Sequence, residues 1–213
     1  MKIALLANSF RDGGRCLAGI ELDEKNNPVF VNNRPRWIRP VCKTVHEEVP
    51  TELALDVSLL DIIEFEPIEF ITSQHQKENV LIENKPFKKA GVFSREHLPA
   101  LCDNNRQKLL FTNRGKAVKE DQLGAIDYSL SLISAENFHV IEKSYEDKAT
   151  PQIRGGFKYN NTDYDFPITD PLFLYEHYSG KHMPGETKNL FMTISLSAPF
   201  ENWAYKLIAA IIH

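Results

Sequence analysis

The stretch RPRWIRPV at residues 34–41 sets a tryptophan among three arginines, with a proline near each end. Side chains alternate between the two faces of a β-strand, so Trp37 and Arg39 share one face, about 7 Å apart, while Arg36 and Ile38 share the other. Proline lacks a backbone N–H, so the two prolines predict a short strand at the edge of a sheet.

Two interpretations of the Trp37 and Arg39 pair stay open. An aromatic ring beside a guanidinium is a surface on which an unpaired base stacks while the arginine donates to phosphate or to a base edge. The same pair fits an ordinary core tryptophan whose ring is covered by the arginine. The first interpretation requires an exposed Trp37 and the second a buried one.

The segments before this strand also have strand patterns. Residues 2–7 form a continuous apolar run typical of a buried strand, and residues 15–22 alternate like a half-buried one. Polar turns lie at residues 8–14 and 23–28. The first part of the chain is therefore predicted to be a β-meander with short connections.

Strand signals resume in the last third of the chain. Residues 153–159 and 162–168 flank Asn160-Asn161, and asparagine tolerates the positive φ angles of a two-residue hairpin turn. Asp170 before Pro171 is typical of a helix start, with the aspartate as N-cap. Many strand signals, few short helices and no regular βαβ alternation favour two small β-barrels over one parallel sheet.

The composition is that of a folded globular protein, with 42% apolar and 25% charged residues. The longest apolar runs fall far short of the roughly 20 residues that cross a bilayer, so no transmembrane helix and no membrane partner are expected. Three widely spaced cysteines, Cys16, Cys42 and Cys102, fit reduced thiols better than a disulfide framework. Without a secretory signal in the first residues, a cytoplasmic location is expected.

Charge is segregated along the chain. The net charge is −4, whereas a protein that binds long duplexes mainly through their phosphates is normally basic. Residues 1–43 hold eight Lys/Arg against four Asp/Glu, and residues 44–73 hold eight Asp/Glu and no Lys/Arg. This pattern fits a nucleic-acid face with a neutral back, or two faces that pair with each other inside the fold.

The better-defined catalytic signatures are absent. The sequence contains no G-x-S-x-G, Walker loop, H-E-x-x-H or C-x-x-C motif, so no catalytic residue, metal ligand or cofactor is predicted. Asp163, Asp165 and Asp170 come nearest to a metal site, but nothing in the sequence brings their oxygens together. A metal-dependent hydrolase built on these aspartates is the least favoured alternative.

Several short patches together resemble one known family. They read CLAGI at 16–20, WIRPV at 37–41, HQKEN at 75–79, RGGFKY at 154–159, TDP at 169–171 and YKLIAAII at 205–212. Over nearly the whole chain they are similar to the prokaryotic dual OB-containing domain family. The resemblance implies a mainly β fold of two OB-like barrels with a few short helices and a partly helical connection. With the strand pattern, it predicts a first barrel at 1–73, a connecting segment at 74–124 and a second barrel at 125–213.

The resemblance also implies a binding role, because such domains look like nucleic-acid or nucleotide recognition modules, some of them in prokaryotic conflict systems. We therefore expect a non-enzymatic module that binds single-stranded nucleic acid or a nucleotide-like ligand. The predicted contacts are Arg15, Arg36, Trp37 and Arg39 in the first barrel and Arg154, Lys158 and Tyr159 in the second. The rival expectation is a protein-interaction module whose acidic residues 44–73 meet a basic partner.

Overall fold

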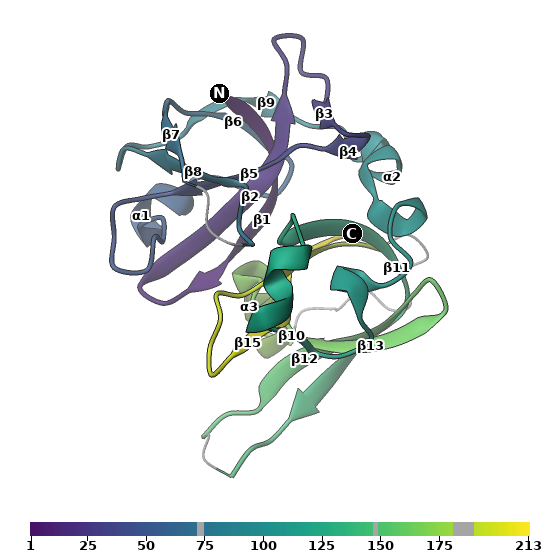
Figure 1. Cartoon of the computed structure of the whole chain (residues 1–213). Helices are drawn as coiled ribbons and strands as arrows, with labels where there is room; N and C mark the ends of the chain where they lie inside the picture. The colour runs from purple at the N-terminus through teal and green to yellow at the C-terminus, as the bar shows by residue number, and fades with distance from the viewer. Residues whose placement is uncertain (72–74, 147–148, 181–189) are drawn as a thin grey trace. The chain divides into compact units, whose positions relative to one another are not determined.

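The computed structural model describes residues 1–71, 75–146, 149–180 and 190–213. The chain divides into two compact units, Met1–Leu101 and Cys102–His213, and each unit has a sheet and a core of its own (Figure 1). The mainly β class predicted from the sequence, with two barrels and a few short helices, is confirmed. None of the described helices is long and apolar enough to span a membrane.

The first unit consists of one seven-stranded sheet, a small hairpin and a short helix. Its strands are β1 (Lys2–Arg11), β2 (Gly14–Leu22), β3 (Phe30–Val31), β4 (Arg34–Pro35), β5 (Trp37–Val41), β6 (Asp61–Glu64), β7 (Pro67–Phe70), β8 (Asn79–Ile82) and β9 (Lys88–Val92). The helix α1 (Thr51–Ala54) lies between β5 and β6. The hairpin β3–β4 turns at Asn32 and Asn33, both with positive φ.

The sheet of the first unit closes on itself. β1 pairs with β2 and β6, β2 pairs with β5, and β5 runs parallel to β8. β8 then pairs with β7, which follows β6 after Phe65 and Glu66 and so continues it as one bent strand. Three strands, a helix and two more strands thus form a closed five-stranded ring, which is the OB barrel. β9 is added at the outer edge of β6.

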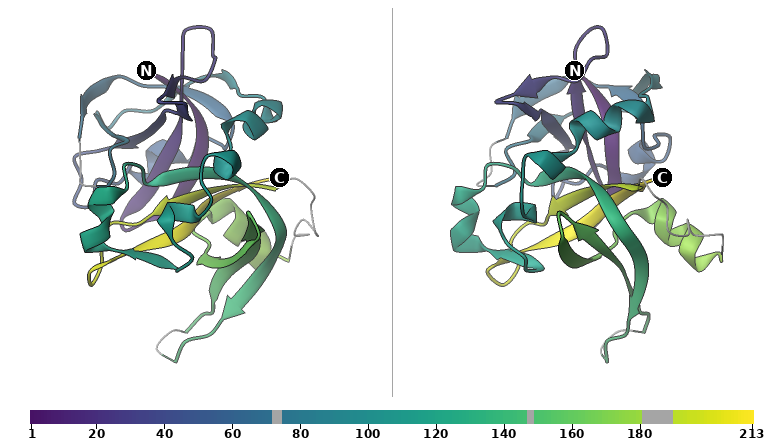
Figure 2. Two further views of the ribbon diagram at one scale, coloured as in Figure 1. Left: turned by 45° about the vertical axis from the view of Figure 1, so that its right-hand side comes forward. Right: turned by 90° about the vertical axis from the view of Figure 1, so that its right-hand side faces the viewer.

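The second unit repeats this plan. Its strands and helix are β10 (Ala117–Lys119), β11 (Leu130–Lys143), β12 (Gln152–Tyr159), β13 (Thr162–Pro167), α3 (Pro171–Tyr178), β14 (Leu190–Leu196) and β15 (Trp203–Ile212). β11 pairs with β14 along its first half and with β12 along its second, so it curves from one side of the barrel to the other (Figure 2). β12 pairs with β13, β14 pairs with β15, and a parallel bridge between Ile168 and Ile208 closes the ring.

A chain of short helices connects the two sheets. It contains η1 (Arg95–His97), α2 (Leu98–Leu101), η2 (Asp103–Asn105) and η3 (Leu110–Thr112), and η4 (Glu120–Ala125) follows β10. The predicted connecting segment 74–124 also includes β8 and β9, which belong to the first sheet. The partly helical character predicted for the connection is confirmed.

The strand that carries Trp37 lies inside its sheet, so its predicted edge position is wrong. β5 has β2 on one side and β8 on the other. The backbone N–H of Arg39 donates to the Glu78 carbonyl on the β8 side, at 2.8 Å. The next residue, Pro40, faces the β2 side, where the ladder has already ended at the pair of Gly19 and Ile38. The missing N–H of the proline therefore removes no ladder bond.

Local signals in the second half of the chain hold in the structure. Asn160 and Asn161 have positive φ angles and form the predicted two-residue turn between β12 and β13. Asp170 is the N-cap of α3: its Oδ1 accepts hydrogen bonds from the N–H groups of Leu172 and Phe173, at 3.0 and 3.2 Å. Its Oδ2 accepts from the N–H of Ile211 in β15, at 3.0 Å. One buried carboxyl group thus joins the helix to the last strand.

We expect Asp170→Ala to lower the free energy of unfolding by about 2 kcal/mol or more, because it removes an N-cap and leaves the buried N–H of Ile211 without its acceptor. Urea unfolding measures this change. Asp163→Ala is the matched control, because the Asp163 side chain is 84% exposed. Equal stabilities of the two variants would contradict this role of Asp170.

Candidate nucleic-acid interface

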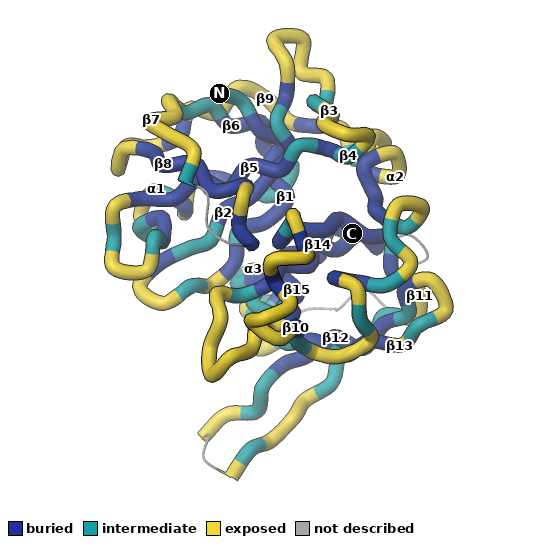
Figure 3. Tube along the Cα trace, in the orientation of Figure 1, coloured by how far each residue is buried: buried dark blue, intermediate teal, exposed yellow. Residues whose placement is uncertain are grey.

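The outer face of the second barrel is lined by polar side chains from β11, β12 and β13. In β13 the rings of Tyr164 and Phe166 are buried in the core, so the alternate residues Asp163 and Asp165 face outward. The strand register places Asp165 opposite Gly156, and Gly156 opposite His139. Figure 3 shows the change from buried residues inside this barrel to exposed ones towards the far end of β11.

A pocket of about 410 Å³ lies on this outer face. It is lined by Arg114, Lys116, Asn137, His139, Ile141, Gly156, Phe157, Lys158, Asp163, Tyr164, Asp165 and Phe166. The volume is in the range of small-molecule sites. β12 and β13 are the second and third strands of the ring, and OB folds bind oligonucleotides and oligosaccharides on the face of these strands.

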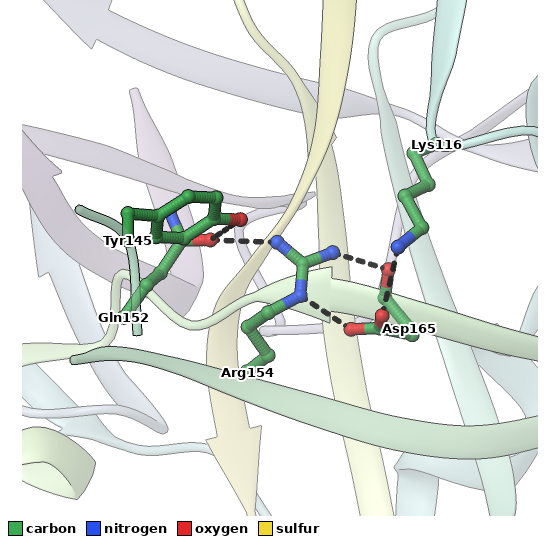
Figure 4. A network of polar contacts seen from close by, with 5 residues as sticks. All are labelled: Lys116, Tyr145, Gln152, Arg154 and Asp165. Atoms are coloured by element: carbon green, nitrogen blue, oxygen red, sulfur yellow. Dashed lines mark hydrogen bonds and ion pairs between the residues drawn. The ribbon is translucent and has the colours of Figure 1, made fainter. Parts of the chain in front are cut away.

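A network of polar contacts fixes the carboxylate of Asp165 beside the pocket (Figure 4). Arg154 Nε donates to Asp165 Oδ1 at 2.5 Å, and Lys116 Nζ donates to Oδ2 at 2.9 Å. Arg154 Nη1 also donates to Gln152 Oε1 at 2.7 Å, and Tyr145 donates to the same oxygen at 3.4 Å. Burial raises the pKa of Asp165, but the hydrogen bonds from Lys116 and Arg154 outweigh it and hold the pKa below its ordinary value. Asp165 is therefore an ionised group with two cationic partners.

A buried lysine holds the turn that precedes Arg114 and Lys116. Lys206 Nζ donates to the carbonyl oxygens of Leu110 and Asn113, both at 2.8 Å, and to Asn113 Oδ1 at 3.0 Å. The turn has two residues in the left-handed region, Phe111 and Thr112. Burial lowers the pKa of Lys206 to about 7. These hydrogen bonds hold the strained turn in one conformation. They therefore fix the backbone from which Arg114 and Lys116 extend.

Three of the predicted contacts, Trp37, Arg39 and Tyr159, are buried. Trp37 is 7% exposed and Arg39 only 1%, with its Nη1 donating to Asn79 Oδ1 at 3.2 Å. The Tyr159 hydroxyl donates to the carbonyl of Gln107 at 2.7 Å, and burial raises its pKa. A buried ring offers no face to a base, so Trp37 belongs to the core. Arg154 is also buried and supports Asp165, as described above.

The other three predicted contacts, Arg15, Arg36 and Lys158, are half-buried. The Arg15 guanidinium lies 4.4 Å from the ring centroid of Phe10, whose side chain is 53% exposed at the β1–β2 turn. Arg36 pairs with Glu21 at 2.9 Å and lies 5.1 Å from the ring centroid of exposed Phe70. Lys158 lines the pocket of the second barrel, 3.8 Å from Asp163.

The acidic segment 44–73 is partly neutralised within its own unit. Asp61 and Glu64 in β6 pair with Lys89 and Lys88 in β9, each at 2.8 Å. Two of these acidic residues are therefore paired within the unit, with lysines of β9.

The aspartates of the hydrolase alternative do not come together as a metal site. Asp170 caps α3, whereas Asp165 is held by Arg154 and Lys116. Within the described part of the chain, no three His, Cys, Asp or Glu side chains are grouped to hold a metal ion.

Sequence reasoning missed Arg114, Lys116, Asn137 and His139. One signal was present in the Gly155-Gly156 pair inside a strand, because glycine in a strand often marks a bulge or a close approach by another group. Arg114 and Lys116 gave no such signal, since their position depends on Lys206, far along the chain.

A family model described as Dual OB-containing domain matches residues 1–211 of the chain. No curated protein matches significantly. Among solved structures, the chain is similar to the p204 HINb domain, with 10% identity, a TM-score of 0.35 and coverage of 98% of this chain and 95% of that one. A murine DNA-binding protein bound with double-stranded DNA is similar at 5% identity, with a TM-score of 0.34 and coverage of 100% and 95%. The Ifi202 HINa domain in complex with 20-bp double-stranded DNA is similar at 11% identity, with a TM-score of 0.34 and coverage of 100% and 94%.

We expect the free energy of unfolding to rise with pH above pH 7 because of Lys206. The pKa of this lysine is about 7 in the folded chain and 10.5 ordinarily, so between these values the unfolded chain binds more protons. The contribution of Lys206 is flat below pH 7 and then rises by at most about 1.4 kcal/mol per pH unit. Urea unfolding between pH 6 and 9 measures it.

Lys206→Met should lose this part of the slope, whereas Lys119→Met, at an exposed position of β10, should keep it. Parallel pH profiles for wild type and Lys206→Met would show that the buried amine does not titrate in this range.

Proposed function

This chain belongs to the dual OB-containing domain family, and we propose that it is a binding module for single-stranded nucleic acid. The site is the outer face of β12 and β13 in the second barrel. The observation that carries the proposal is the pocket on the strands with which OB folds bind oligonucleotides, lined by Arg114, Lys116 and Lys158.

The charges of the pocket support an anionic ligand. Three cations line it against two carboxylates, and one of these, Asp165, is also paired with Arg154. Asp163 is exposed and 3.8 Å from Lys158, a separation at which a surface ion pair holds weakly. A phosphate therefore meets Lys158 and Arg114 without first breaking a strong internal pair.

Three features favour a single strand over a duplex. The site is a small concave pocket, which suits an unpaired unit better than the regular backbone of a duplex. The net charge of −4 opposes binding that depends on many phosphates at once. In the first barrel, the exposed rings of Phe10 and Phe70 lie beside the half-buried guanidinium groups of Arg15 and Arg36, an arrangement that suits stacking on unpaired bases. We include Arg15 and Arg36 in the proposal as secondary contacts.

We expect the double variant Arg114→Ala/Lys158→Ala to bind a fluorescent 15-nucleotide single strand about tenfold more weakly than wild type. Each lost phosphate contact also reduces the slope of log affinity against log salt concentration by about 0.7. Fluorescence anisotropy between 50 and 200 mM salt measures both quantities.

The double variant Lys25→Ala/Lys43→Ala is the control, because it removes the same two charges from exposed positions of the first unit. If the slope of log affinity against log salt concentration is unchanged in the Arg114→Ala/Lys158→Ala variant, the binding site lies elsewhere. Equal affinity for a duplex of the same length would overturn the preference for single strands.

A further inference from the structure

We infer that the pocket takes one unpaired nucleotide, whose base stacks on the imidazole of His139. The inference rests on the proposed function and specifies which part of the ligand enters the pocket. It depends on three features of β11 and β12: a bulge at Asn137, the position of the His139 ring and the absence of a side chain at Gly156.

The bulge brings two polar side chains to the pocket. The pairing of β11 with β12 shifts register between Glu136 and His139, and Asn137 has a φ of 53°. Such bulges bend a strand and re-aim its side chains. Asn137 and His139 both line the pocket. The amide of Asn137 can donate and accept at once, which matches the mixed edge of a nucleobase.

The His139 ring is held by its own strand and lies over the backbone of the next. His139 Nδ1 is 3.1 Å from the carbonyl oxygen of Asn137, so Nδ1 carries a proton and donates to it. A Cβ built on Gly156 would lie 2.4 Å from His139 Nε2 and 2.5 Å from Cε1. The imidazole ring therefore occupies the space that the Cβ of any other residue at position 156 would need. The side chain of His139 is nevertheless exposed, so part of the ring remains open to a base.

The two adjacent glycines serve opposite faces of β12. A Cβ on Gly155 would lie 2.6 Å from Ile208 Cδ1 and 2.7 Å from Phe138 Cε2, both hydrophobic side chains of the barrel interior. Gly155 is thus required by the core. Gly156 meets the exposed His139 and Ile141 Cδ1 at 3.0 Å, on the pocket side. The close contacts at Gly155 therefore concern the packing of the core, whereas those at Gly156 concern the pocket.

Phosphate and base therefore have separate partners in one pocket. Arg114, Lys116 and Lys158 supply the positive charge, and His139 with Ile141 supplies a flat and apolar surface. A nucleoside monophosphate has both parts, whereas inorganic phosphate has only the first. Calorimetric titration of the full chain with adenosine 5′-monophosphate and with inorganic phosphate separates the two contributions.

We expect adenosine 5′-monophosphate to bind at least tenfold more tightly than inorganic phosphate. His139→Ala should weaken nucleotide binding about tenfold, the size of one lost stacking contact, and His139→Phe should restore it. Gly156→Ala should weaken nucleotide binding by a similar factor, because the new methyl group displaces the imidazole of His139 from its position over β12. The melting temperature of Gly156→Ala should not fall, because the displaced group is an exposed side chain. Gly124→Ala is the matched control, since a Cβ there meets nothing within 4 Å.

No nucleotide binding at millimolar concentration, or full binding by both His139→Ala and Gly156→Ala, would overturn the inference. If the 15-nucleotide strand binds wild type and Gly156→Ala equally well, the inference fails while the proposed function stands. If the mononucleotide binds wild type but the 15-nucleotide strand does not, the proposed function fails and the nucleotide pocket remains.

Discussion

Closure of each small sheet on itself is the constraint on which the rest of this structure depends. A small sheet of five strands buries its apolar face without a second layer only by curling into a ring. In the second unit the parallel bridge between Ile168 and Ile208 completes that ring, and β11 bends to pair on both sides. The interior is then filled by rings such as Phe157 and Phe166, which leaves polar chemistry to the outer face.

The outer face of that barrel joins structural and ligand-facing charges in one network. Arg154 is buried and fixes Asp165, and Asp165 in turn holds Lys116 at the pocket. From the opposite direction, Lys206 fixes the turn that leads to Arg114 and Lys116. Lys116 is therefore held by Asp165 on one side and by the Lys206-bound turn on the other, and a cation fixed in this way loses little conformational entropy when it meets an anion.

Local patterns in the sequence predicted the elements well, and long-range packing decided the rest. The Asn160-Asn161 turn and the Asp170 cap were predictable because their signals lie within a few neighbouring residues. The full length of β11 was not evident from the sequence, since the bulge at Asn137 interrupts its alternation. The burial of Trp37 and Arg39 was not predictable. Periodicity shows on which face of the strand a residue lies, but not whether other parts of the chain cover that face. The pocket depends on contacts such as that between Lys206 and Asn113, which no local pattern encodes.

The link between Asp170 and Ile211 has a consequence for folding during synthesis. The ring of the first barrel needs no residue beyond Ile82, because its closing contact joins β5 to β8. The second barrel needs β15, and the second oxygen of the Asp170 carboxyl group has its partner only when Ile211 is present. On the ribosome the first barrel can therefore form while the second is still being made. The second barrel cannot close until β15 has been made, and until then one edge of β14 lacks the strand with which it pairs.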